Sequence, residues 1–156
     1  HLGFNKDMYP ENNYPEGDYN DVAEKYAVDI LEHEHEDQLE KDHGPVFFLK
    51  NFPERTSPFW NMARNDDGET AKKVDVILHG IETIGSAQRS CDKEQMRKQF
   101  IEISNGEYAN MLFSQFSKDR VMKEMNDFLS KEFFPRFGGG IGMTRMIRAM
   151  KMSNLI

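Results

Sequence analysis

Two acids and an arginine stand at equal intervals of seven residues in the middle of the chain: Asp75, Glu82 and Arg89. Mg²⁺ is usually held by one or two protein carboxylates together with phosphate oxygens. An arginine can bind a further carboxylate through two parallel hydrogen bonds. These residue types therefore suit a site for a magnesium polyphosphate and a carboxylate substrate, if the fold brings them together.

Two adjacent strands are needed to place both acids in one site, because residues seven apart in a straight strand point to opposite faces. Residues 72–78 alternate as a strand, and 81–90 predict a second strand after a tight turn at His79-Gly80. We note no lysine beside the acids in these strands, so a cation such as Mg²⁺ would balance their charge. The alternative is that both acids simply face solvent.

Arg89 also lies an odd number of residues beyond Glu82. The second strand must therefore break its alternation if both side chains are to point into one site. We expect a bulge at Gly85-Ser86, because glycine inside a strand often marks one. Without that bulge, Arg89 is more typical of a surface ion-pair partner.

The segment GGGIGMTR concentrates four glycines within five positions and ends at Arg145. It is not a P-loop, since no lysine follows Gly142, and the dinucleotide fingerprint would need glycine at position 143. In one interpretation, the glycines allow positive φ and close backbone packing where a strand meets a helix. In the other, a flat ligand lies against this backbone, and Arg145 meets an anion at the helix N-terminus. The glycines concerned are Gly138, Gly139, Gly140 and Gly142.

A last helix is expected from Met143 onward. Its apolar residues recur at helical spacing and predict one buried side. Arg145 falls on the other side of this helix and is therefore free to reach a ligand. The residues predicted to be buried are Met143, Met146, Ile147 and Met150.

The acidic run EHEHED (32–37) offers a metal-binding alternative through His33 and His35. On a helix these two side chains diverge by about 200°, so they do not easily share one ion. We interpret the run as a solvated acidic face of a helix.

Composition limits the class of protein. The chain has 156 residues, a formal net charge of −7 and a pI near 5.2, which argues against a broad basic surface for nucleic acid. Its single cysteine excludes an intrachain disulfide, and no apolar run is long enough to span a membrane. We expect a single cytoplasmic domain over residues 1–156 that does not bind a membrane.

The remaining pattern predicts an α+β fold, in which an antiparallel sheet is flanked by helices. Residues 1–20 are expected to form an irregular arm. The other predicted elements are helices at 20–43, 92–104, 107–117 and 119–132, strands at 45–52, 57–62 and 135–142, and a turn at 65–69.

Three stretches in order resemble a known family: PVFFLKNFPERTSPFWNM, KKVDVILHGIETIGSAQRSCD and FPRFGGGIGMTR. They look like the C-terminal half of the catalytic domain of class II aminoacyl-tRNA synthetases. The aspartyl and asparaginyl enzymes, and the synthetase-like enzymes that make asparagine, are the most similar subgroup. The resemblance covers roughly residues 44–152.

The resemblance implies an ATP- and Mg²⁺-dependent ligase that activates aspartate or asparagine as an adenylate, with tRNA or ammonia as the acceptor. The substrate carboxylate is then the nucleophile, so the protein needs positioning and positive charge rather than a catalytic triad. By this resemblance, Asp75 and Glu82 would hold Mg²⁺, and Arg145 would bind the γ-phosphate of ATP. Gly138, Gly139, Gly140 and Gly142 would lie under the nucleotide, Arg89 would clamp the substrate side chain, and Ser86 and Gly85 would line that pocket.

The chain also departs from the family pattern. The first motif, which forms the dimer, and the second, which supplies an arginine for the α-phosphate, are not found in residues 1–43. A homodimer is implied only by the relatives. The alternative function is a non-catalytic, truncated module that keeps nucleotide binding or a structural role.

Overall fold

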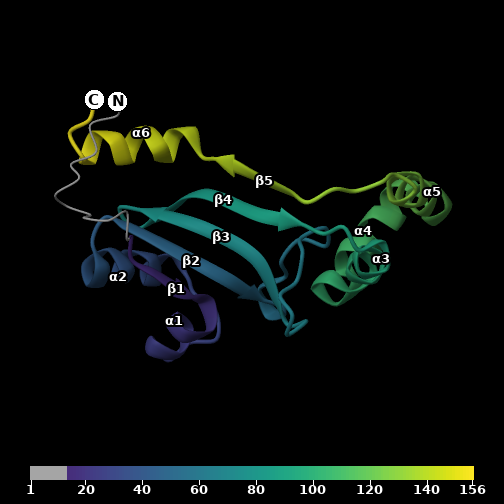
Figure 1. Cartoon of the computed structure of the whole chain (residues 1–156), viewed down its shortest axis with the longest axis horizontal. Coiled ribbons are helices and arrows are strands. Elements are labelled where there is room, and N and C mark those ends of the chain that lie inside the picture. Colours follow the sequence, from purple (N-terminus) through teal and green to yellow (C-terminus); the bar gives the residue numbers. More distant parts are fainter. Residues whose placement is uncertain (1–13) are drawn as a thin grey trace. The chain divides into compact units, whose positions relative to one another are not determined.

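The computed structural model describes residues 14–156, which contain a five-stranded sheet and α-helices (Figure 1). The strand order is β1-β2-β3-β4-β5, and β1 pairs with β2 in parallel. The strands are β1 (Glu16–Asp18), β2 (Val46–Pro53), β3 (Thr70–Leu78), β4 (Ile81–Arg89) and β5 (Arg136–Ile141). The α-helices are α1 (Tyr19–Lys25), α2 (His33–His43), α3 (Lys93–Glu102), α4 (Glu107–Phe116), α5 (Lys118–Leu129) and α6 (Met143–Met152), with short 3₁₀ turns at Glu54–Thr56 and Ile103–Gly106. The predicted α+β class is confirmed.

The described chain divides into two compact units. The first consists of residues 14–52, Lys73–Ser86 and Gly139–Ile156, and the second of Pro53–Lys72 and Ala87–Gly138. Among the described residues, no helix has both the length and the apolar composition needed to cross a membrane.

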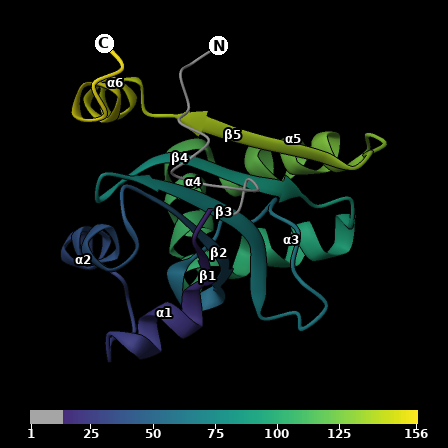
Figure 2. The same ribbon diagram turned by 60° about the vertical axis from the view of Figure 1, so that its left-hand side comes forward.

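The core of the first unit lies between α1, α2 and the strands β2 and β3. In Figures 1 and 2, α1 and α2 cover one side of these strands, and α6 lies on the other side. Apolar side chains from all four elements pack together there, and their burial is what holds the helices to the strands. They are Tyr19, Val22, Ala23, Leu39, Phe47, Leu49, Phe52 and Ile77.

The turn between β3 and β4 is the one that the sequence predicts. His79 and Gly80 have φ of 48° and 69°. Two consecutive positive φ values are the mark of the tight hairpin turn whose twist matches that of the flanking strands. The two strands that carry Asp75 and Glu82 are therefore adjacent.

The second unit has its own core between α3, α4 and α5. Asp92 caps α3, since its side chain accepts hydrogen bonds from the backbone N–H groups of Glu94 and Gln95. The buried residues of this core are Met96, Phe100, Ala109, Met125 and Leu129. These three helices agree with the predicted ones.

The predicted helix at 20–43 is wrong, because the chain forms two helices there. Ala27, with φ of 56°, ends α1. Glu32 then starts α2 with a capping box, in which the His35 ring accepts a hydrogen bond from the Glu32 backbone N–H. The apolar residues keep helical spacing across residues 26–32, but the backbone is not helical there.

Two further predictions need correction. The strand expected at 57–62 is absent: Ser57 has φ of 51° and Pro58 has no N–H to donate, so only an isolated bridge from Met62 to Arg89 forms. Of the predicted irregular arm at 1–20, residues 1–13 lie outside the described residues, and the rest includes β1 and the start of α1.

The apolar side of α6 is only partly covered, contrary to the predicted burial. Ala149 is buried, and Met146 and Met150 are half-buried. Met143 is 64% exposed and Ile147 is 43% exposed. Periodicity therefore identified the apolar side of this helix but not how much of it packs.

Candidate functional site

Asp75 and Glu82 meet over Gly85 in the first unit. A Cβ atom placed on Gly85 would lie 2.9 Å from Glu82 Oε1 and 3.3 Å from Asp75 Oδ1. Glu82 and Gly85 are three residues apart, so a regular strand would put them on opposite faces. The Glu82 carboxylate nevertheless lies beside Gly85, while β4 continues without interruption from Ile81 to Arg89, so the bulge at Gly85-Ser86 stays a prediction.

Asp75 is buried with only half of its carboxylate satisfied. The residue is 4% exposed, and its Oδ1 atom has no hydrogen-bond partner among the described residues. Burial raises the pKa of this carboxyl to about 6, with the neighbouring acids adding to the rise. An unsatisfied buried carboxylate oxygen is costly, so this atom is the one best placed to take a cation.

A lysine does neutralise part of this site, contrary to the sequence analysis. The ammonium of Lys73, on the same strand, forms an ion pair with Asp75 Oδ2. Lys73 and Asp75 are two residues apart and share one face of β3, which is why they meet. The signal was present in the sequence as an i, i+2 pair.

Glu36 is a third acid of this site, and the sequence analysis placed it on a solvated helix face. Its Oε2 atom accepts a hydrogen bond of 2.9 Å from the backbone N–H of Glu82. Burial raises the pKa of Glu36, and the charge of Glu82 acts in the same direction, whereas Arg145 lowers it. Nothing local to residues 32–37 indicates that α2 packs against the start of β4.

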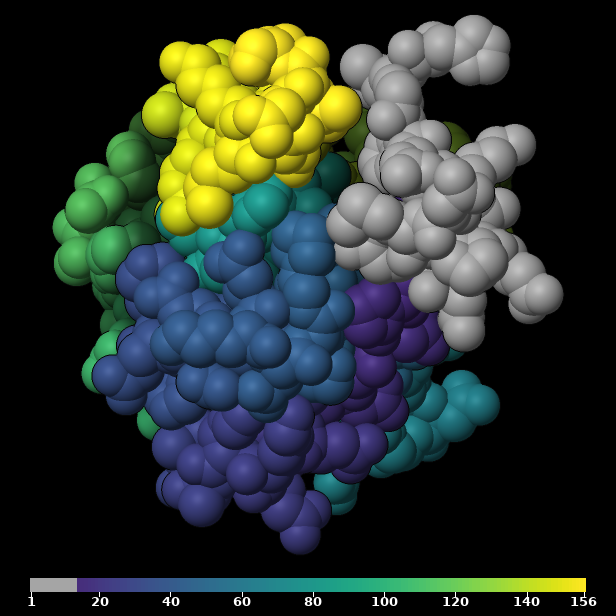
Figure 3. All heavy atoms as spheres, turned by 90° about the vertical axis from the view of Figure 1, so that its left-hand side faces the viewer, coloured from purple at the N-terminus to yellow at the C-terminus, as the bar shows by residue number. Residues whose placement is uncertain are grey.

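Arg145 lies in the first turn of α6, close to the β3–β4 hairpin. Its Nη1 atom donates a hydrogen bond of 2.6 Å to the backbone carbonyl of Glu82, and the side chain remains exposed. The backbone N–H of Gly142 donates to the carbonyl of Thr83 at 2.8 Å, which fixes the start of α6. Figure 3 shows α6 (yellow) and α2 (blue) on one surface of this unit, with hairpin atoms (teal) between them.

None of the four glycines before α6 has positive φ, and the closest approach of other atoms occurs at Gly139. A Cβ atom on Gly139 would lie 2.6 Å from the carbonyl oxygen of Gly85 and 2.8 Å from Ser86 Cβ. On Gly142 it would lie 3.3 Å from Arg145 Cδ, and on Gly140 it would meet nothing within 4 Å. The bare backbone of Gly139 thus lets β5 approach β4.

Ser86, the other residue of the first unit that the resemblance assigns to the substrate pocket, is turned toward its neighbouring strand. Its hydroxyl donates a hydrogen bond of 3.3 Å to the carbonyl of Val74. Ser86 is thus engaged with the backbone of β3.

Arg89 and Gly138 belong to the second unit. The Arg89 guanidinium donates to Asn61 Oδ1 at 3.1 Å and to the Gly138 carbonyl at 3.2 Å. A Cβ atom on Gly138 would lie 2.9 Å from Arg89 Nε, so a larger residue there would require the Arg89 side chain to shift. Asn61 is a partner that the sequence analysis missed.

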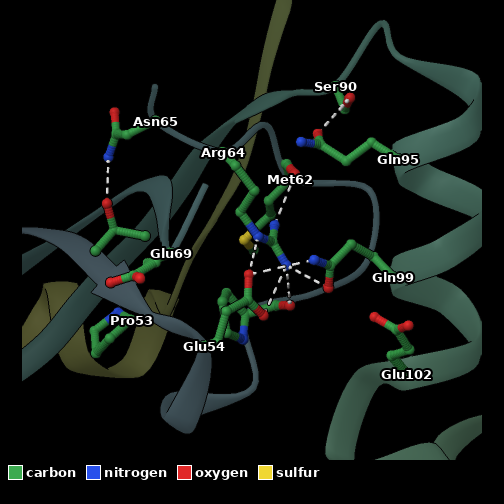
Figure 4. Close-up of polar contacts among 12 residues, drawn as sticks. Pro53, Glu54, Met62, Arg64, Asn65, Glu69, Ser90, Gln95, Gln99 and Glu102 are labelled. Atoms are coloured by element: carbon green, nitrogen blue, oxygen red, sulfur yellow. Dashed lines mark hydrogen bonds and ion pairs between the residues drawn. The ribbon is translucent and has the colours of Figure 1, made fainter. Parts of the chain in front are cut away.

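A buried arginine organises the segment that leads from β2 to β3 (Figure 4). Arg64 forms an ion pair with Glu54 and donates to the carbonyls of Met62 and Pro58 and to Gln99 Oε1. Its side chain is 1% exposed, and these partners satisfy it from several directions. In this unit, the network replaces the missing strand at 57–62 as the support for the irregular segment.

The carboxylate oxygens in the first unit suit a magnesium ion that is also bound by phosphates and water. They do not suit a metal ion that is ligated by protein side chains alone. Within residues 14–156, no group of three or more His, Cys, Asp or Glu side chains is arranged to hold a metal by itself. Magnesium needs only one or two carboxylates when phosphates and water complete its shell. Asp75 Oδ1, which has no partner in the described part of the chain, meets that requirement together with Glu82 Oε1.

The fold is that of class II synthetases. The structure matches the asparaginyl-tRNA synthetase of Pyrococcus horikoshii complexed with asparaginyl-adenylate with a TM-score of 0.68 and 17% identity, covering 92% of this chain and 32% of that one. It matches the Entamoeba histolytica asparaginyl-tRNA synthetase in complex with asparaginyl-adenylate with a TM-score of 0.69 and 17% identity, covering 93% and 34%.

The sequence defines the family. Residues 3–156 match the model for tRNA synthetases class II (D, K and N), and the chain belongs to this family. It is 31% identical to the aspartate–tRNA(Asp) ligase of Pyrobaculum aerophilum, over 88% of this chain and 31% of that protein. It is 38% identical to the asparagine–tRNA ligase of Shewanella denitrificans, over 56% and 19%. The chain thus spans less than a third of these relatives.

Proposed function

We propose that this chain supplies part of the ATP site of a ligase that activates aspartate or asparagine as an adenylate. Membership in the synthetase family supports the ligase class. Relatives specific for aspartate and for asparagine both match, so either amino acid is proposed as the substrate.

One observation carries the proposal: the buried Asp75 Oδ1, which has no hydrogen-bond partner among the described residues, lies with Glu82 Oε1 beside the bare backbone of Gly85. Two carboxylate oxygens beside bare backbone would supply the one or two protein ligands that Mg²⁺ takes when phosphates and water complete its shell. When bound, Mg²⁺ would neutralise charge on the triphosphate and so ease departure of pyrophosphate. Asp75 and Glu82 are the residues proposed to hold it.

The basic residues are proposed to act on the two ends of the reactants. Arg145, anchored by one hydrogen bond to Glu82 and otherwise exposed, would bind the γ-phosphate with its remaining N–H donors. Arg89, oriented by Asn61 and Gly138, would clamp the side-chain end of the amino acid.

The remaining residues would shape the two binding surfaces. The glycines Gly138, Gly139, Gly140 and Gly142 would lie under the nucleotide, and Gly85 and Ser86 would line the amino-acid pocket. The attacking group would be the substrate's own carboxylate, and the protein's contribution would be orientation and fixed charge.

The acceptor is proposed to be tRNA, as the names of the relatives indicate for those proteins, with ammonia as the alternative. A homodimer in the cytoplasm, not bound to a membrane, is the proposed setting.

Calorimetric titration of the chain with Mg·ATP tests this function. Arg145→Ala should weaken binding by about 10- to 100-fold, since a charge-assisted hydrogen bond to phosphate contributes roughly 1.5–3 kcal/mol. Arg148→Ala is the matched control: Arg148 lies in the same helix, is exposed, and also donates to a backbone carbonyl, that of His79. Its affinity for Mg·ATP should equal that of the wild type.

Equal affinity of the wild type and Arg145→Ala would contradict the γ-phosphate assignment. Exchange of labelled pyrophosphate into ATP, measured with aspartate and with asparagine, separates the catalytic from the non-catalytic function. Nucleotide binding without exchange for either amino acid would favour the non-catalytic module.

A further inference from the structure

Lys73 brings a positive charge to a site otherwise suited to a metal ion. Its ammonium is paired with Asp75 Oδ2 and lies 3.7 Å from the centroid of the Phe52 ring. Phe52 is buried in the core of the first unit, and the Lys73 side chain is only 21% exposed. A cation packed on an aromatic face and bonded to a buried acid is held in place. The charge therefore belongs to the site.

Lys73 makes the environments of the two Asp75 carboxylate oxygens different. Oδ2 is occupied by the ammonium, whereas Oδ1 has no partner in the described chain and faces Glu82 Oε1 over Gly85. A cation bound at Oδ1 would then share one carboxylate with the ammonium. Like charges at that range repel strongly where water is partly excluded.

Whether Lys73 weakens or strengthens cation binding depends on whether the cation arrives free or bound to a polyphosphate. A free divalent cation brings two positive charges next to Lys73. A divalent cation already bound to a nucleoside triphosphate arrives in a complex with net negative charge, which the ammonium attracts. The other charged groups that face the site are Glu82 on β4, Glu36 on α2 and Arg145 on α6.

We propose that Lys73 makes this site select a divalent cation carried on a polyphosphate over the free cation. The preference for polyphosphate rests on the proposed nucleotide function, whereas the repulsion of a free cation does not. Lys73 is a specificity-determining residue that acts on the metal through Asp75.

Manganese titrations followed by electron paramagnetic resonance test the proposal on the whole chain. Lys73→Met removes the charge but keeps an unbranched side chain over Phe52, and Lys73→Arg keeps the charge. Without nucleotide at low salt, Lys73→Met should bind Mn²⁺ about tenfold more tightly than the wild type. With Mn·ATP as the ligand, the same variant should bind several-fold more weakly. Lys73→Arg should follow the wild type in both titrations.

Mn²⁺ affinity that is unchanged or weaker in Lys73→Met, or Mn²⁺ binding by none of the proteins, would overturn the proposal. Thermal unfolding of each variant shows whether it is folded, and Lys73→Gln serves as a second neutral variant if Lys73→Met is not. If no protein binds nucleotide, the proposed function and the preference for polyphosphate both fail. The titrations with Mn²⁺ alone still decide the repulsion in that case.

Discussion

The backbone N–H of Glu82 donates a 2.9 Å hydrogen bond to the side chain of Glu36, from a helix 46 residues earlier in the chain. The same residue of β4 receives a hydrogen bond from Arg145, 63 residues later, on its carbonyl oxygen. Both peptide groups of this proposed metal ligand are thus held by side chains of opposite charge. The orientation of Glu82 therefore depends on two helices.

Removing the Glu36 carboxylate should destabilise the first unit. Glu36→Ala leaves the N–H of Glu82 without its acceptor and should cost about 1–2 kcal/mol in the free energy of unfolding. Glu36→Gln keeps an oxygen acceptor and removes a partly buried charge, so its cost should stay under about 0.5 kcal/mol. Urea denaturation at neutral pH measures both. Glu34→Ala, at a side chain that is 83% exposed in the same helix, is the control and should be neutral. Equal stability of Glu36→Ala and Glu34→Ala would show that the bond contributes nothing.

A methyl group on Gly85 should disrupt cation binding more than folding. In Gly85→Ala the new Cβ would come within 2.9 Å of Glu82 Oε1 and 3.3 Å of Asp75 Oδ1, so the two oxygens would have to separate. We expect at least an approximately tenfold loss of Mn²⁺ affinity, since each factor of ten is only about 1.4 kcal/mol. Gly140→Ala is matched, because a Cβ there meets nothing within 4 Å. An identical Mn²⁺ affinity in the two variants would place the cation elsewhere.

Stability without metal should fall as the pH rises through the pKa of Asp75. Burial raises this pKa from 3.8 to about 6, so between these values the folded chain binds more protons than the unfolded chain. The contribution of protonated Asp75 to the free energy of unfolding is present below about pH 4 and is lost by about pH 6. Its size is at most roughly 1.4 kcal/mol for each unit by which folding raises the pKa. Asp75→Asn should lack this dependence, so its stability relative to the wild type should increase from pH 4 to pH 7. Urea denaturation across that range, with a chelator present, measures the difference. Parallel curves for the two proteins would mean that Asp75 titrates normally.

Local patterns in the sequence predicted much of the fold. The hairpin around His79-Gly80 follows from two alternating strands joined by a two-residue turn, and the helices at α3, α4 and α5 follow from their period. These features depend on residues close together in the chain, so spacing and turn chemistry reveal them. The family motifs similarly picked out Asp75, Glu82 and Gly85, which the structure brings together in the first unit.

Tertiary structure decided the burial and charge pairing of residues, which local sequence patterns do not reveal. The sequence predicts a solvated Glu36, because no residue near it in the chain indicates that α2 packs against β4. The helix predicted over 20–43 is interrupted because a single residue, Ala27, adopts positive φ, and the exposed Met143 shows that apolar spacing does not reveal what covers a helix. Periodicity identifies which side of an element is apolar, whereas burial and charge pairing depend on contacts between residues far apart in the chain. The sequence by itself thus indicated most of the elements and the proposed ligands. Only the packing of α2, β3 and α6 around β4 decided the environment of those ligands.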